Sequence, residues 1–534
     1  MVLAFSTGQT GPRFCVFRCR RDAAAYRKPY ASRAADATAL GYTRYDIGVT
    51  EPARPGVFRR LFGGFRLAYL PVLVTYFCYG ASTVTAVAML YFEKQTLGLT
   101  PAEAAQIAFW LGLPWSMKMV AGVSSDAYPI LGSRRGAYLL LGAAASLAGY
   151  LALATVVETK SAYLLATVLV TVGFMVQDVI ADALSVEIAR DDEEIGQIQT
   201  LGRMAILLGG ISVGYLSGVL ASAIGPRNTF AVAMALPLVV AATVPAIRVA
   251  RQAPASAAAG ALGGGRARFI MLVGLGYAAL GVALELASLP LSQEIVLVVS
   301  AALIGLLLKH IGISRGVVVA AIVIFLFRAA PQVGQGYSYW AIDQLGFDER
   351  FLGVLAQVGA VVSLVGLLAF RTTIVKRPVS FTLLWVMIAG AVLSLPNIGL
   401  FYGLHEWLGV SARTLAFIDT TVSAPLAQLT MVPMLILIAR TAPPGAEATM
   451  FAIMASLMNL ALSASQLFTR YLNDAYHVTQ ADYSNLGRLM ITVGILSLLP
   501  LVVLPLLWRQ EHAAPAPPLP GPAMEPAGGP RLHE

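Results

Sequence analysis

Charged residues are scarce in this chain. Asp, Glu, Lys and Arg together make up 12% of its 534 residues, whereas hydrophobic residues make up 57%. A soluble domain typically carries about 25% charged residues, and the mean hydropathy here is +0.73. The composition therefore excludes an ordinary soluble domain and predicts a protein that crosses the bilayer many times.

Cysteines and catalytic motifs are also scarce. The three cysteines, Cys15, Cys19 and Cys78, are too few and too poorly spaced for a disulfide framework. No neighbouring residues complete a zinc site around Cys15 and Cys19. The sequence holds no phosphate-binding loop and no nucleophile-base motif. We therefore expect free thiols, no metal, no cofactor and no catalysis.

Acidic residues are fewer than basic ones, 28 against 37, which gives a formal net charge of +9. The basic residues crowd the first 66 positions and the short loops between apolar runs. Membrane topology explains this distribution better than nucleic-acid binding does. Residues 1–66 resemble an organellar transit peptide in composition, but we favour a disordered cytoplasmic tail. No secretory signal precedes the first apolar run, and the Pro/Ala-rich residues 510–534 are expected to be disordered.

Long apolar runs divide the rest of the chain. A helix needs about 20 mostly apolar residues to cross the hydrocarbon core, and this length predicts spans near 68–92, 104–124, 136–157, 162–186, 200–224, 229–247, 269–290, 294–310, 316–340, 350–371, 379–402, 413–439, 447–470 and 487–508. The predicted protein is all-α, with six-helix halves at 67–247 and 316–509. A linker and an inserted helix pair occupy 248–315. Since 294–310 is short for a span, the prediction is 12 to 14 transmembrane helices.

The loops between these spans differ in their content of Lys and Arg. One set of loops holds most of them, including Arg134, Arg190, Arg315, Lys376 and Arg440. Because short cytoplasmic loops carry an excess of Lys and Arg, both termini are predicted to be cytoplasmic. This orientation holds whether or not the inserted pair crosses the membrane, because two crossings return the chain to the same side.

The loop after the second span reads LPWSMKMVAGVSSDAYPILGSRRGAY from Leu113 to Tyr138. A carboxylate at a helix end beside guanidinium groups can hold one conformation and release it in another. We predict such a conformational clamp, with Glu447 as its counterpart in the second half. Its predicted members are Lys118, Gly122, Asp126, Arg134, Arg135 and Glu447.

This loop, together with three further segments, resembles a known family. Six-plus-six spans with this loop are similar to the major facilitator superfamily. Within it, QDVIADALSVEIAR (177–190), FRAAPQVGQGYSYWAIDQLGFDERFLGVL (327–355) and PPGAEATMFAIMASLMNL (443–460) resemble the folate-biopterin transporter branch. The resemblance implies a major-facilitator-type fold and a monomeric secondary transporter that works by alternating access on a folate, a pterin or a related heterocycle.

Charged side chains inside the apolar runs mark the predicted site. A charge at the bilayer centre costs about 2.5–3.5 kcal/mol, so such residues are expected to line a cavity. Asp178 and Asp182 are four residues apart and share one helical face. With Arg328 and Asp419 they form the predicted substrate-binding or proton-coupling set, and Glu285 lies on the inserted pair.

These charges allow three interpretations. The carboxylates suit the amino-oxo edge of a pterin, with Arg328 on a cargo carboxylate and Phe77, Tyr337, Tyr339 or Trp340 stacking on the ring. Two close carboxylates also suit proton coupling. The third interpretation is a structural bridge from the Asp pair to Arg203 or Arg328.

Rival functions remain open at this point. The same fold could carry another metabolite, such as a peptidoglycan fragment, or serve a non-transporting role in pigment-complex assembly, although the PPGAEATMFA segment disfavours the latter. The expected partners are a small-molecule substrate, the lipid bilayer and, in the coupled case, a proton. The expected location is a plasma or inner membrane, or alternatively an organelle envelope.

Overall fold

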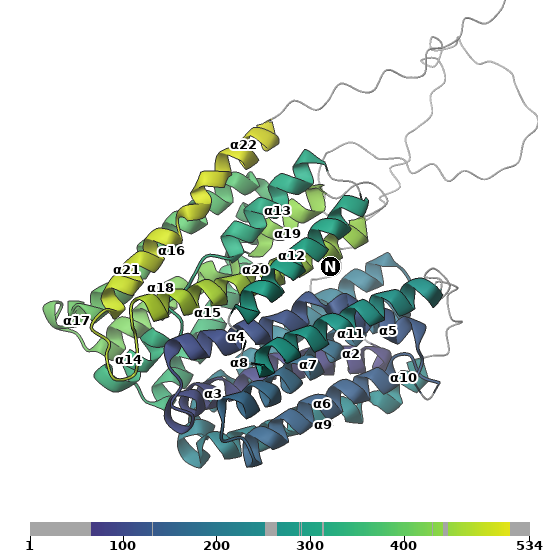
Figure 1. Ribbon diagram of the computed structural model, residues 1–534, viewed down its shortest axis with the longest axis horizontal. Helices are drawn as coiled ribbons and strands as arrows, with labels where there is room; N and C mark the ends of the chain where they lie inside the picture. The colour runs from purple at the N-terminus through teal and green to yellow at the C-terminus, as the bar shows by residue number, and fades with distance from the viewer. Residues whose placement is uncertain are drawn as a thin grey trace, which may run out of the picture. The chain divides into compact units, whose positions relative to one another are not determined.

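The chain folds entirely into helices in the computed structural model. The structure describes residues 66–130, 132–250, 264–287, 289, 291–311, 314–429, 431–441 and 447–512. Within these ranges no β-strand occurs, and nine helices are long and apolar enough to cross a membrane. The predicted all-α membrane protein is confirmed (Figure 1).

The N-terminal helices run from residue 67 to residue 250. They comprise η1 (Leu67–Tyr69), α2 (Leu70–Ala81), η2 (Ser82–Thr85), α3 (Ala86–Tyr91), η3 (Phe92–Thr96), α4 (Pro101–Ser116), α5 (Lys118–Ala127), α6 (Gly136–Thr155), α7 (Lys160–Ile188), α8 (Asp192–Ala233), α9 (Ala235–Ala242) and α10 (Val244–Ala250). Thr100 and Glu103 form a capping box that starts α4. α8 bends sharply at Gly225, whose φ of 79° suits glycine and which precedes Pro226. The bend separates the two spans predicted near 200–224 and 229–247.

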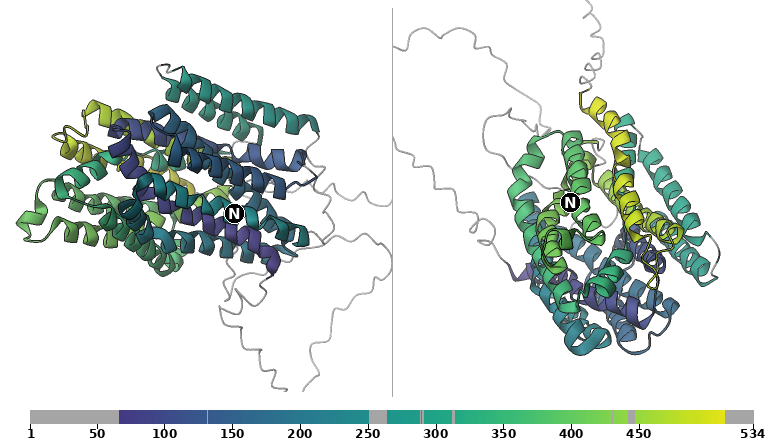
Figure 2. Two further views of the ribbon diagram at one scale, coloured as in Figure 1. Left: turned by 90° about the horizontal axis from the view of Figure 1, so that it is seen from below. Right: turned by 90° about the vertical axis from the view of Figure 1, so that its left-hand side faces the viewer.

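The inserted pair comprises α11 (Gly264–Leu286) and α12 (Ser292–Ile311). α11 packs against α5 of the N-terminal helices, and α12 packs against α20 (Glu447–Ala475) of the C-terminal helices. In Figure 2 the teal pair lies at the periphery of the helices in both views. It is therefore an addition that contacts both parts of the protein.

The C-terminal helices begin with α13 (Arg315–Arg328). They continue with α14 (Gln335–Leu345), α15 (Glu349–Lys376), α16 (Val379–Phe401), α17 (Leu404–Trp407), α18 (Ala412–Leu429), α19 (Met431–Thr441), α20 (Glu447–Ala475), α21 (Leu486–Leu496), η5 (Leu499–Val503) and α22 (Leu504–His512). In Figure 1 they are the green and yellow ribbons, whereas the N-terminal helices are purple and blue.

The predicted span near 316–340 is interrupted over several residues. The sequence predicts a single helix over 316–340, but α13 ends at Arg328 and α14 starts at Gln335. Pro331 cannot donate a backbone hydrogen bond, and Gly334 has a φ of 69°. Both residues interrupt the helix, and the freed backbone groups need other partners.

α20 supplies those partners from one face. Ser465 Oγ donates to the carbonyl of Ala330 at 2.6 Å. The backbone N–H of Gln332 donates to Thr469 Oγ1 at 2.9 Å. Asn473 Nδ2 donates to the carbonyl of Val333 at 3.1 Å. The interruption is therefore held by a row of polar side chains spaced four residues apart.

Two sides of the bundle can be distinguished. The Arg66 side holds the start of α2 and the junction of α7 with α8, where Arg66 contacts the Ile188 carbonyl and Glu194. The Lys94 side holds η3 and the start of α15. Lys94 Nζ lies 2.7 Å from Asp343 Oδ1 there, which joins the N-terminal and C-terminal helices.

A second contact between the two sets uses glycine. α8 crosses α15 at Gly218 and Gly353, where the backbones touch. A Cβ on Gly218 would lie 2.1 Å from the carbonyl oxygen of Glu349, and one on Gly353 would lie 2.9 Å from Gly218 Cα. No residue larger than glycine fits at this crossing without displacing the backbone.

Candidate functional site

Lys118 and Asp178 form the centre of a charged site in the N-terminal helices. Lys118 is the first residue of α5, directly after the break between α4 and α5 at Met117. Its Nζ atom donates to Asp178 Oδ2 on α7, and Asp178 is only 7% exposed. An ammonium beside a buried carboxylate offsets the cost of burying the negative charge. Lys118 is a predicted member of the clamp, but in the structure it contacts Asp178.

An aromatic group adjoins this ion pair. Lys118 Nζ lies 4.8 Å from the ring centroid of Trp115, within cation–π range. The centroid of Tyr79 lies 5.3 Å from that of Trp115 and 6.0 Å from that of Phe174. These three rings form the aromatic cluster of the site, in which Phe174 is 4% exposed and supports Tyr79 from the hydrophobic core. Sequence reasoning named other aromatics, and of these Phe77 is 40% exposed.

Asp182 lies one helical turn after Asp178. Its Oδ1 atom accepts a hydrogen bond from the hydroxyl of Tyr76 on α2. Arg203 on α8 lies close enough to act electrostatically on Asp178 and on Tyr76. The predicted shared face of Asp178 and Asp182 therefore meets two cations and a phenol.

The charges of the C-terminal helices are arranged differently. Arg328 is the last residue of α13, and its buried Nε atom has no hydrogen-bond partner among the described residues. Asp419 Oδ2 accepts from Asn397 Nδ2 at 2.8 Å, and Tyr337 Oη donates to Asn397 Oδ1 at 2.7 Å. Asp419 is thus joined to α16 and α14 by neutral groups, while its Oδ1 is buried without a partner among the described residues.

A cavity of about 760 Å³ lies beside the interruption between α13 and α14. Polar groups from both sets of helices reach it, together with apolar residues of α4, α16 and α21. The polar lining comprises Glu93, Gln332, Gln335, Tyr337, Ser394, Asn397, Gln466 and Ser497. Lining by an interrupted helix is typical of binding sites in secondary transporters.

The predicted clamp has a definite arrangement. Arg135 Nη2 lies 2.6 Å from Asp126 Oδ1 and 2.6 Å from Glu187 Oε1, and its Nη1 donates to Ser125 Oγ at 2.6 Å. Burial lowers the pKa of Arg135, but the Glu187 and Asp126 carboxylates outweigh it, so the pKa is raised overall. The guanidinium therefore stays charged while three partners hold it. The Glu447 side chain lies outside the described residues.

Contacts on the Lys94 side join the two sets of helices. Besides the Lys94–Asp343 ion pair, Tyr91 Oη donates to the carbonyl of Phe347 at 3.0 Å, and Gln480 Nε2 donates to the carbonyl of Leu99 at 2.8 Å. Tyr483 also donates to Asp343, and burial with this bond raises its pKa. Lys94 was not among the predicted site residues. Its position at the end of an apolar run was the only available signal.

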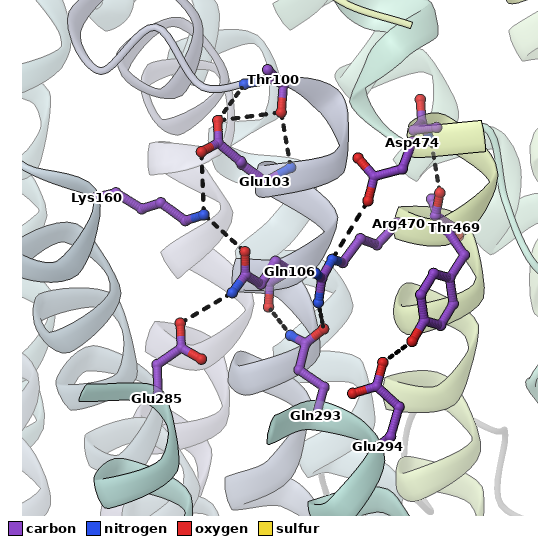
Figure 3. A network of polar contacts seen from close by, with 12 residues as sticks. Thr100, Glu103, Gln106, Lys160, Glu285, Gln293, Glu294, Thr469, Arg470 and Asp474 are labelled. Carbon is purple, nitrogen blue, oxygen red and sulfur yellow. Dashed lines mark hydrogen bonds and ion pairs between the residues drawn. The ribbon is translucent and has the colours of Figure 1, made fainter. Parts of the chain in front are cut away.

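The inserted pair is attached through Gln106 of α4 (Figure 3). Gln106 Nε2 donates to Glu285 Oε1 of α11 at 3.2 Å, and Gln293 Nε2 of α12 donates to the Gln106 carbonyl at 3.0 Å. Arg470 of α20 donates to Gln293 Oε1 at 2.9 Å. Glu285, predicted inside a span, therefore belongs to a polar network that links both sets of helices to the pair.

The comparisons with known proteins agree with this architecture. The model of the BT1 family matches residues 80–514, which include the inserted pair, the C-terminal helices and the N-terminal helices from the end of α2 onward. The chain belongs to the BT1 family. Curated relatives of this BT1 family member include "Folate-biopterin transporter" from Synechocystis sp., which is 27% identical over 444 residues, covering 82% of this chain and 81% of the relative.

Other relatives carry similar names. "Folate transporter 2" from Plasmodium falciparum is 21% identical and covers 84% of this chain and 90% of its own. "Probable folate-biopterin transporter 4" from Arabidopsis thaliana is 23% identical, covering 80% and 93%. The resemblance to the folate-biopterin transporters is confirmed, and this BT1 family member is a membrane transporter.

Solved structures identify the fold. A POT family transporter in complex with 5-aminolevulinic acid has a TM-score of 0.61 at 15% identity, covering 84% of this chain and 98% of its own. A nucleoside transporter has a TM-score of 0.57 at 11% identity, covering 83% and 100%. The BT1 family member has the predicted major-facilitator-type fold.

Proposed function

We propose that this transporter carries a folate, a pterin or a related heterocyclic metabolite by alternating access. The observation that carries the proposal is the aromatic cluster of Tyr79, Trp115 and Phe174 beside the Lys118–Asp178 pair. Flat rings suit a conjugated heterocycle, and the ion pair offers a donor and an acceptor to its polar edge. The printed names of the relatives support the same cargo class.

Arg328 adds a site for a negative charge. Arg328 is half-buried, its Nε atom is buried without a hydrogen-bond partner, and it has no counter-ion among the described residues. A carboxylate of the cargo would satisfy this guanidinium with two parallel hydrogen bonds. Folate carries carboxylates, whereas a simple pterin does not. Arg328 therefore distinguishes the two cargoes, and Asp178 with Asp182 binds the polar edge of the ring.

The transport cycle moves the two sets of helices relative to each other. The halves 67–247 and 316–509 rock around the site, and the contacts at Lys94, Tyr91 and Gln480 hold the Lys94 side closed in this conformation. With both termini cytoplasmic, the Lys94 side faces outward and the described state is closed to the outside. Asp126, Arg135 and Glu187 act as the clamp that stabilises one conformation over the other. The transporter works as a monomer.

The test is uptake into cells that lack their own folate and pterin routes. Labelled folate and an uncharged labelled pterin are supplied separately to cells that make the wild-type protein, with membrane abundance measured alongside. Saturable uptake of either compound is expected. With the protein present in the membrane, failure to take up both would overturn the cargo class, and uptake of folate alone would give Arg328 the dominant role.

A further inference from the structure

Glu93 is a buried carboxylate that the proposed cargo site does not use. It lies in η3, a single π-helical turn at the Lys94-side end of the first membrane helix, and is 9% exposed. Single π-turns inside helices are frequently found at functional sites. Here the turn places two neighbouring ionisable residues, Glu93 and Lys94, inside the protein.

The Glu93 carboxylate is only half satisfied. Tyr163 Oη of α7 donates to Oε1 at 2.9 Å. Oε2 is buried and has no hydrogen-bond partner among the described residues, and the same is true of the hydroxyl of Tyr339 on α14. Tyr339 lies close enough to Glu93 for the two to interact electrostatically. A buried carboxylate without a cation binds a proton in preference to staying charged.

Cations on the surrounding elements are engaged elsewhere. Lys94 binds Asp343 at 2.7 Å. Lys160 binds Glu103 at 3.3 Å and Gln106 Oε1 at 2.8 Å. Arg227 of α8, which lies over the ring of Phe92, donates to the carbonyls of Thr155 and Val157 at 3.0 and 2.8 Å. The other ionisable groups facing this region are Glu103, Tyr163, Tyr339 and Tyr483. None of the described cations forms an ion pair with Glu93.

The position of Glu93 connects a proton site to the contact between the two sets of helices. Glu93 lines the cavity of about 760 Å³. Lys94, the next residue, joins the C-terminal helices through Asp343. When the Lys94 side opens, this ion pair breaks and the same helical turn meets water from that side. When it closes, the Glu93 carboxyl is buried and faces the cavity.

We propose that Glu93 is the proton-binding residue that couples cargo movement to a proton gradient, an inference that rests on the proposed transport function. Oε2 takes a proton from water on the Lys94 side, which forms an O–H bond and neutralises the carboxylate. The neutral carboxyl allows the Lys94–Asp343 contact to close over it. The proton then leaves Oε2 for water in the cavity as that cavity opens to the Arg66 side. Cargo and proton therefore move in the same direction.

The experiment uses the purified full-length protein in lipid vesicles with the membrane potential clamped at zero. An inward gradient of one pH unit is expected to drive labelled folate to about tenfold accumulation in the wild type, the ratio for one proton per cargo. Glu93→Gln keeps an oxygen that accepts from Tyr163. It should abolish accumulation while folate counterflow, which needs no net proton movement, stays within about twofold of wild type. Glu406→Gln, an exposed carboxylate on α17, is the matched control and should accumulate folate normally.

A second readout needs no cargo. The infrared spectrum of the wild type in lipid should contain a protonated-carboxyl band that Glu93→Gln removes and Glu406→Gln retains. Accumulation by Glu93→Gln, or a wild type without this band, would overturn the proton site. A Glu93 band in a wild type that transports neither folate nor pterin would uphold the proton site and overturn the proposed cargo.

Discussion

Asp178 and Arg135 of the N-terminal helices are paired with opposite charges, whereas Arg328 and Asp419 of the C-terminal helices have no counter-ion among the described residues. Asp178 has Lys118, and Arg135 has two carboxylates. In the C-terminal helices, Asp419 is bound by an amide, and Arg328 Nε has no partner among the described residues. Two halves of similar architecture thus have different electrostatic roles. In the C-terminal helices, Arg328 is the residue that we propose an anionic cargo to satisfy.

Removing one member of the N-terminal pair should have the largest effect. Asp178→Asn leaves the Lys118 ammonium without its counter-ion and beside the rings that we propose to receive the cargo. We expect uptake of both folate and pterin to fall by tenfold or more, at unchanged membrane abundance, because unpairing a buried charge is strongly unfavourable. Glu158→Gln, an exposed loop carboxylate, is the control. Equal uptake by Asp178→Asn and Glu158→Gln would show that transport does not require the Lys118–Asp178 ion pair.

Removing the unpaired cation should have a selective effect. Arg328→Ala deletes a charge-assisted contact worth about 1.5–3 kcal/mol, so the KM for folate should rise by roughly ten- to a hundredfold. The KM for an uncharged pterin should change by less than about threefold, because that contact is then not made. Arg488→Ala, an exposed cation on α21, should behave as wild type for both. An equal rise in KM for folate and for the uncharged pterin would show that Arg328 does not bind the carboxylate of the cargo.

The clamp should respond moderately. Asp126 is half-exposed, so its ion pair with Arg135 is worth little as stability and acts on the balance between conformations. Asp126→Asn should leave abundance normal and slow uptake by about two- to fivefold. Glu187→Gln removes the other carboxylate from the same guanidinium and should give a similar loss. Full uptake activity in both variants would contradict the proposed role of these residues as a conformational clamp.

Glu285 of the inserted pair should matter least. It is held by a neutral amide, not by a cation, and Glu285→Gln can still accept a hydrogen bond from Gln106. Uptake should stay within about twofold of wild type, with thermal stability lowered by a few degrees at most. A loss as large as that of Asp178→Asn would place the inserted pair in the transport cycle.

Much of the fold was predictable because apolar runs long enough to span a membrane can be located directly in the sequence. The inserted pair follows from the length of two apolar runs, and the shared face of Asp178 and Asp182 follows from their helical spacing. The interruption after Arg328 did not, because Pro331 and Gly334 are tolerated in membrane helices when a neighbour satisfies the backbone. That neighbour, α20, is more than a hundred residues away in sequence.

The site itself was harder to predict because partners depend on packing. Lys118 belongs to the loop motif by sequence, yet the break at Met117 turns it toward Asp178. Glu93 lies at the end of an apolar run, where a carboxylate normally meets water. Only the structure shows that Tyr163 and the C-terminal helices cover it.

The glycine crossing of α8 and α15 has a consequence for movement. Because Gly218 and Gly353 present backbone alone, neither residue has a side chain that must change rotamer when the two helices rotate against each other there. Elsewhere a rocking motion must disengage interlocked side chains. This crossing can therefore serve as a pivot with a low activation barrier, and the turnover rate would depend on two residues that never touch the cargo.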